Sequence, residues 1–176
     1  MRCSVLSLCV LVLSLGIAGP GARAAGDQRA QTAGTQCRTG ERVAWTCEMG
    51  RKVLSVCLQA NRQAAYRYGP LGKPELQIVS NGRDGRAHRN EVMTSGGGNQ
   101  QHLRFTNGGY EYIVYSGITG PHFDPANLRS SGLVILRGEE QVASRECPRN
   151  GVLQRIPYGE IQFIRADDSN AYEDEF

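Results

Sequence analysis

The sequence predicts an all-β protein, a small antiparallel barrel or sandwich of about eight short strands with long loops. Two observations lead to this prediction. Three segments combine alternating apolar residues with a two-residue turn, which is the pattern of β-hairpins. No segment offers a sustained apolar repeat of 3.6 residues, as an amphipathic helix would. Several short strands separated by turn residues are typical of barrels and sandwiches.

The N-terminal residues 1–24 are expected to form a secretory signal peptide. Arg2 supplies a positive start, residues 5–18 are mainly apolar, and residues 22–24 read Ala-Arg-Ala, the small-x-small pattern of a cleavage site. The apolar run is shorter than the ~20 residues that a membrane span needs. We therefore expect a periplasmic or secreted protein, cleaved near Ala24, with no stable membrane insertion.

Export places the cysteines in an oxidising compartment, where an even number of them favours disulfides. Cleavage would remove two of the six cysteines. The four that remain are Cys37, Cys47, Cys57 and Cys147. We expect one β domain over residues 37–165, with a flexible lead-in at 25–36 and a solvated acidic tail at 166–176.

Residues 43–58 are predicted to form a hairpin that turns at Gly50-Arg51. In that register every large apolar side chain lies on one face. The facing pairs are Met49 with Lys52, Cys47 with Leu54, Trp45 with Val56, and Val43 with Leu58. Cys47 then points inward and Cys57 points the other way, so these two cysteines should not bond to each other. Two disulfide connectivities remain open.

A second hairpin is predicted over residues 102–115, with Asn107-Gly108 as a type I′ turn that needs a positive φ at Gly108. The predicted facing pairs are Phe105 with Tyr110, Leu103 with Tyr112, and Arg104 with Glu111.

A third hairpin, over residues 132–147, is predicted to turn at Gly138-Glu139. It sets Arg137 across from Glu140 and Ile135 across from Val142. Two further strands are expected at residues 64–68 and 75–79, because turn residues separate these two short segments.

Two segments, 80–101 and 116–132, are expected to be long loops. Loops beyond about 12–15 residues in a compact domain tend to be functional or disordered. The first holds Arg86 and Arg89, followed by Ser95-Gly96-Gly97-Gly98, and the second holds Ser116-Gly117, His122, Phe123 and Asp124. The glycine run would permit close approach of backbone to a partner, and the arginines would influence the association rate.

The sequence contains no evident catalytic constellation. The three histidines lack metal-ligand spacing, and no cysteine pair has zinc-finger spacing. No G-x-S-x-G or phosphate-binding motif is present, and no RNA-binding signature. We therefore expect a binding protein and not an enzyme, with no metal, no cofactor and no nucleic-acid partner.

Residues 45–57, WTCEMGRKVLSVC, resemble the opening strand pair, Y-T-C-x-x-G-x-x-L-x-V, of the periplasmic and membrane-bound inhibitors of c-type lysozyme. The resemblance implies a β-barrel with a bridge from Cys47 to Cys147, which leaves Cys37 to pair with Cys57. It also implies an inhibitory Ser-Gly loop, for which Ser95-Gly96 and Ser116-Gly117 are the candidates. The chain is similar as well to exported bacterial proteins of unknown function.

The expected function is that of an exported, disulfide-bonded inhibitor of a cell-wall hydrolase such as lysozyme, which blocks the sugar cleft sterically. The expected target-binding residues are Ser95, Gly96, Gly97, Arg86, Arg89, Ser116 and Gly117. The alternative is a periplasmic ligand-binding or immunity protein without enzymatic activity.

Overall fold

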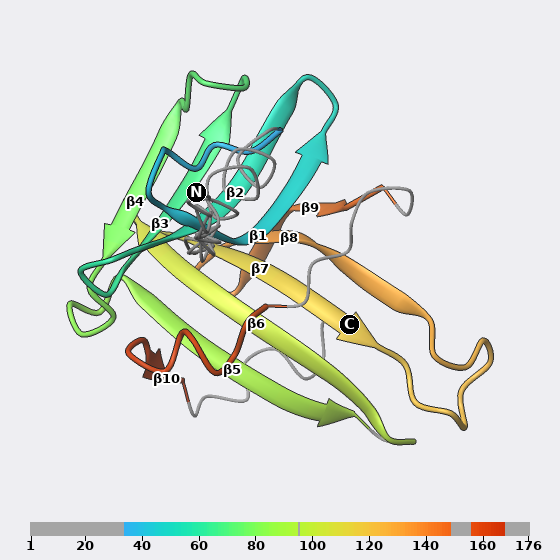
Figure 1. The fold of residues 1–176 in the computed structure, drawn as a ribbon. Coiled ribbons are helices and arrows are strands. Elements are labelled where there is room, and N and C mark those ends of the chain that lie inside the picture. The colour runs from blue at the N-terminus through green and yellow to red at the C-terminus, as the bar shows by residue number, and fades with distance from the viewer. Residues whose placement is uncertain (1–33, 95, 149–155, 168–176) are drawn as a thin grey trace, which may run out of the picture.

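The computed structural model describes residues 34–94, 96–148 and 156–167, and Figure 1 shows them in colour. These residues form strands and no helix, so the all-β prediction is confirmed. The strands are β1 Arg42–Met49, β2 Lys52–Gln59, β3 Gln63–Gly69, β4 Leu76–Ser80, β5 Ala87–Thr94, β6 Gly98–Asn107, β7 Tyr110–Ile118, β8 Arg129–Arg137, β9 Glu140–Glu146 and β10 Arg165–Ala166.

The strands lie in two sheets, one with the order β1-β2-β3-β4 and one with the order β10-β5-β6-β7-β8-β9. All pairs are antiparallel except β10 with β5. One core cluster takes side chains from both sheets, among them Trp45, Leu54 and Tyr66 from the first and Leu103 and Phe105 from the second. Of the two architectures expected, the described residues therefore form packed sheets and not a closed barrel.

The register of the first hairpin is confirmed near its turn and wrong at its far end. Met49 pairs with Lys52, Cys47 with Leu54, and Trp45 with Val56, as predicted. Val43, however, pairs with Cys57, because a bulge lies between Val43 and Trp45. An extra residue in one strand shifts the facing, so Ala44 and Trp45 both enter the shared core, while Val43 packs against Cys57 in a separate cluster.

The second hairpin turns one residue later than predicted. Asn107 pairs with Tyr110, so Gly108 and Gly109 form the turn, and Phe105 faces Tyr112. This register differs from the predicted one by two residues, and side chains alternate with a period of two, so the face assignment survives. The predicted contact between Arg104 and Glu111 also survives, but as a diagonal ion pair of 3.1 Å.

Gly108 has the positive φ that the sequence predicts, +60°, and a Cβ placed there would meet no atom within 4 Å. A side chain at position 108 would therefore destabilise the fold through its backbone conformation and not through a clash with other atoms. We expect Gly108→Val to lower the melting temperature more than Gly108→Asn does, because asparagine tolerates the left-handed region and a β-branched residue does not. Equal melting temperatures in thermal denaturation would contradict this.

The third hairpin has the predicted Arg137–Glu140 pair next to its turn. Ile135 faces Ala143 and not Val142, because a second bulge lies between Ile135 and Leu136. Val142 is left 43% exposed as a result.

The first expected long loop is largely strand, whereas the second is strand only at its two ends. Residues 87–94 form β5 and pair along their full length with β6, while residues 116–118 and 129–132 belong to β7 and β8. The predicted strands at 64–68 and 75–79 correspond to β3 and β4. Because β5 carries mostly polar residues, its strand character comes from pairing with β6 and not from intrinsic propensity. The connection 119–128, which is the larger part of the second segment, remains irregular.

The two disulfides are Cys37–Cys57 and Cys47–Cys147, the pairing that the resemblance implies. Cys47 belongs to the shared core, and Cys147 follows β9 and packs against that core, so this bridge ties the smaller sheet to the larger one. Cys57 lies on the outer face of the smaller sheet with Ala65 and Val79. Two bridges of this kind indicate an oxidising compartment. The expected signal peptide at 1–24 lies outside the described residues.

The domain extends further at both ends than predicted. Thr35 and Gln36, which were assigned to the flexible lead-in, are buried, and the Gln36 side chain donates to the carbonyl oxygens of Gly69 and Pro70 at 2.8 Å each. Ala166 belongs to β10, and Asp167 forms an ion pair with Arg104. The rest of the expected acidic tail, 168–176, lies outside the described residues.

The C-terminal segment 156–164 enters the space between the sheets. Ile156, Ile161 and Ile164 are fully buried in the shared core. An ion pair joins Glu160 to Arg42 of β1, and the Arg165 amide donates to the carbonyl of Gly82 at 2.9 Å. The segment therefore connects the smaller sheet to the β4–β5 turn and contributes three large side chains to the core.

A buried ion pair lies on the outer face of the smaller sheet. Arg67 is 1% exposed and Glu41 is 9% exposed at the side chain. The Arg67 guanidinium donates to both carboxylate oxygens of Glu41, at 2.5 and 2.7 Å, and to Gln77 at 2.9 Å. Burial by itself raises the pKa of Glu41, but hydrogen bonds from Arg67, the Arg38 backbone and Gln59 outweigh it and lower this pKa to about 2.

We expect Glu41→Gln to destabilise the fold at neutral pH by about 3–5 kcal/mol, because the substitution leaves a buried guanidinium without its charge partner. A depressed pKa means that the folded state binds the proton less tightly than the unfolded state. The contribution of Glu41 is therefore complete above pH 4.5 and decreases as the pH falls toward 2.

Urea denaturation at several pH values would measure both effects, with exposed Glu48→Gln as the control. An equal and small loss of stability in both variants at neutral pH would contradict the role of Glu41.

Candidate functional site

Ser116 and Gly117 do not form a loop. Both lie near the end of β7, paired on both sides, where Ser116 faces Gln101 of β6 and Ser131 of β8. A Cβ on Gly117 would lie 2.8 Å from the Gln100 side chain. The prediction that Ser116-Gly117 forms a projecting loop is therefore wrong.

The two candidate arginines have different surroundings. Arg86 is exposed in the turn before β5. Arg89 lies within β5, where its guanidinium donates to the Ile164 carbonyl at 2.9 Å and to the Tyr158 hydroxyl at 2.5 Å and lies over the Tyr158 ring at 4.8 Å. Arg89 thus holds the C-terminal segment against the larger sheet, and it is not an exposed rim charge.

The glycine run and the 119–128 connection, which the sequence presents as separate candidates, lie together at one end of the larger sheet. Figure 1 shows the β5–β6 turn beside the β7–β8 connection. A Cβ on Gly96 would lie 2.7 Å from the Phe123 ring, and one on Gly97 would lie 3.4 Å from Pro121. A Cβ on Gly120 would overlap the Gly96 carbonyl. We call residues 93, 94, 96, 97 and 119–128 the tip; Ser95 lies outside the described residues.

Internal hydrogen bonds shape the 119–128 part of the tip. The Thr119 hydroxyl accepts from the Leu128 amide at 2.8 Å and donates to the Pro125 carbonyl at 2.9 Å. The Thr119 amide donates to the Leu128 carbonyl at 2.9 Å, and the Phe123 amide donates to the Gly120 carbonyl at 3.2 Å. These bonds close the connection on itself and hold Phe123 above Gly96.

The tip presents two large apolar side chains to solvent. Met93 is 70% exposed and Phe123 is 44% exposed. Two other exposed large apolar residues, Leu71 and Val142, lie in the β3–β4 turn and in β9. Exposed apolar side chains that gather at one place mark interaction sites more often than scattered ones do.

A row of polar residues runs across the core-facing side of the larger sheet next to the tip. Glu91, Gln101, Ser116 and Ser131 occupy facing positions on β5, β6, β7 and β8. The Glu91 carboxylate accepts from the Asn99 amide at 2.8 Å and from the Gln101 amide at 3.0 Å. No sequence signal distinguished Glu91 or Gln101, because the row exists only once the strands pair.

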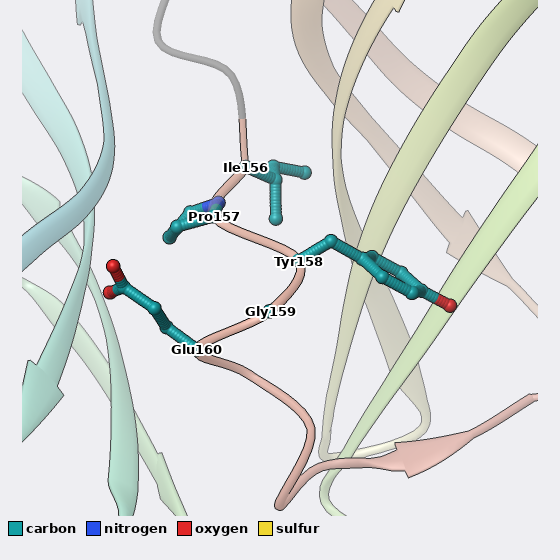
Figure 2. Close-up of a pocket in the computed structure, with 5 residues that line it drawn as sticks. All are labelled: Ile156, Pro157, Tyr158, Gly159 and Glu160. Atoms are coloured by element: carbon teal, nitrogen blue, oxygen red, sulfur yellow. The ribbon is translucent and has the colours of Figure 1, made fainter.

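A shallow pocket of about 350 Å³ lies along residues 156–160. Figure 2 shows Tyr158 pointing toward the larger sheet and Glu160 pointing toward the smaller one. All the lining residues come from this one segment, and Glu160 is already paired with Arg42. The pocket therefore has few convergent polar groups of the kind that orient a small ligand.

Neither the buried histidine nor the one cluster of potential metal ligands in the described residues offers a reactive site. His102 is 1% exposed, and burial lowers its pKa to about 4, so it is neutral at physiological pH. Among the described residues, one group with potential metal ligands brings Cys37, Glu41 and Cys57 within 4.8 Å, but its two sulfur atoms are bonded to each other. The described part of the chain has no helix with the length and apolar character to cross a membrane.

Comparisons of the chain with protein-family models, with curated proteins and with solved structures found no match.

We expect Gly120→Ala to separate the two parts of the tip, because its Cβ would overlap the Gly96 backbone, which cannot rotate away as a side chain can. Overpacking of this kind costs about 1–3 kcal/mol. The matched control is Gly159→Ala, whose Cβ would meet nothing within 4 Å.

Hydrogen exchange by mass spectrometry would locate the effect of Gly120→Ala, with faster exchange expected at residues 96–98 and 119–128. Unchanged exchange there would contradict the close contact between the two loops.

Proposed function

We propose that this protein is an exported, disulfide-bonded binding protein, and that its partner is a cell-wall hydrolase of the lysozyme type. The observation that carries the proposal is the tip. Its two loops pack against each other at one end of a disulfide-bonded β scaffold, and it exposes Met93 and Phe123 to solvent. Rigid scaffolds that carry exposed loops at one end are a common arrangement for recognition.

The resemblance of residues 45–57 to the lysozyme inhibitors directs the choice of partner. Of its two Ser-Gly candidates, the first contributes Gly96 to the tip, whereas Ser116-Gly117 falls within the sheet. The tip is therefore the segment proposed to enter the sugar cleft. Inhibition would be steric, because a protein loop that occupies the cleft excludes the polysaccharide.

Preorganisation supports this mechanism. Ordering a flexible loop on binding costs free energy, and Gly96 already packs against Phe123 and Gly120. A partner would then bind it with less loss of conformational entropy than it would bind a free glycine run.

Turbidity assays of cell-wall lysis by c-type, i-type and g-type lysozymes would test the proposal with the oxidised protein. We expect inhibition of the c-type enzyme, and we expect it to be lost in the double variant Ser95→Tyr/Gly97→Asn, which adds bulk to the tip. Asparagine tolerates the φ of +82° at Gly97. The control is Gly108→Asn in the β6–β7 turn, another exposed turn with a positive φ.

Lysis that proceeds at full rate with all three enzymes would overturn the proposed partner. Full inhibition by the double variant would exclude the tip as the inhibitory segment.

A further inference from the structure

Only part of the glycine backbone of the tip is open to a partner, because Gly97 is exposed and Gly96 is half-buried. Gly96 lies under the Phe123 ring, and Gly97 lies beside Pro121, so the small size of these residues serves contacts within the tip. Phe123 and Met93 remain turned to solvent, at 44% and 70% exposure. The tip therefore presents two large side chains in addition to the exposed backbone at Gly97.

A carboxylate without a counter-ion lies directly behind Met93. Glu91 is two residues before Met93 on β5 and shares its face, since side chains alternate along a strand. Two amide groups orient the carboxylate, at 2.8 Å from Asn99 and 3.0 Å from Gln101. Within the described ranges, no ion pair joins Glu91 to a cation.

The surroundings of Glu91 add further acceptor character. Gln101 is 1% exposed, and its carbonyl oxygen Oε1 has no hydrogen-bond partner. Because no donor among the residues that the structure describes binds the Gln101 Oε1 atom, its negative partial charge adds to that of the neighbouring carboxylate. Together these groups favour a positive charge at the partly exposed Glu91.

Among the described residues, the nearest basic side chains on this face form no ion pair with Glu91. Arg89 lies two residues along β5, and its guanidinium is directed to the Tyr158 hydroxyl and the Ile164 carbonyl. These partners are neutral, so Arg89 keeps its charge but makes no direct contact with Glu91. Arg129 lies three strands away in the Met93 row, roughly 15 Å from Glu91 by strand geometry. That separation exceeds the Debye length of about 8 Å at physiological salt.

We propose that the tip binds a protein surface in which an apolar hollow lies beside a lysine or arginine side chain. Met93 and Phe123 enter the hollow, and the Glu91 carboxylate binds the cation. This inference rests on the proposed function for the location of the surface and specifies the chemistry of the partner.

NMR titration of the ¹⁵N-labelled oxidised protein tests this inference without any hydrolase. The probe is n-pentylammonium chloride, which combines an apolar chain with a cationic head, and the controls are neutral n-pentanol and anionic sodium pentanoate. We expect pentylammonium to shift the signals of the Met93, Gly96 and Phe123 amides and the Asn99 and Gln101 side-chain amides. Pentanol should shift the first three only, and pentanoate should have the smallest effect.

Two variants separate charge from apolar contact. Glu91→Gln should weaken pentylammonium binding roughly two- to fivefold, the range of an exposed ion pair, and leave pentanol unchanged. Met93→Ser should weaken both. The matched controls are Glu139→Gln and Leu71→Ser, which change an exposed carboxylate and an exposed apolar residue elsewhere.

Equal shifts with all three probes, or shifts outside the tip and the Glu91 row, would overturn the inference. The inference would also be overturned if the signals near Glu91 shifted in a titration with calcium chloride and did not shift with pentylammonium. The titration contains no lysozyme. Its outcome therefore does not depend on whether the protein inhibits lysis in the turbidity assay, and the two proposals can fail separately.

Discussion

The burial of one core shared by two sheets is the constraint on which the rest of this structure depends. Neither sheet could hide its apolar face alone, and Trp45, Tyr66 and Phe105 become fully buried only where the sheets meet. The C-terminal segment adds three isoleucines to the same core. Consequently the disulfide between Cys47 and Cys147 joins positions that the packing already brings together.

The larger sheet extends past the smaller one, as Figure 1 shows, and this difference creates the proposed binding surface. Where the sheets overlap, the core-facing side of β6 to β8 is apolar; beyond the overlap the same side of the larger sheet carries Glu91, Gln101 and Ser116, and then Met93. The change from apolar to polar along one face locates the end of the core. The tip is the last part of this extension.

The outer face of the smaller sheet is closed by a different kind of interaction. Residues 34–41 cover it with the Cys37–Cys57 bridge, the Gln36 hydrogen bonds and the Arg67–Glu41 pair. A buried ion pair is weak evidence for high stability, because desolvation offsets its Coulomb attraction. Its geometry is nevertheless specific, and it determines how the chain before β1 lies across the sheet.

The local pattern of the sequence determined the all-β class, the three hairpins, the inward position of Cys47 and the positive φ at Gly108, because period-two alternation and turn chemistry act over a few residues. The structure decided what depends on distant partners. The bulges at Val43 and Ile135 arise because the side chains on both faces of a strand must pack against their neighbours at the same time. β5 became a strand through its pairing with β6, and the glycine run met Phe123 across 27 positions of sequence, a contact that no local pattern encodes.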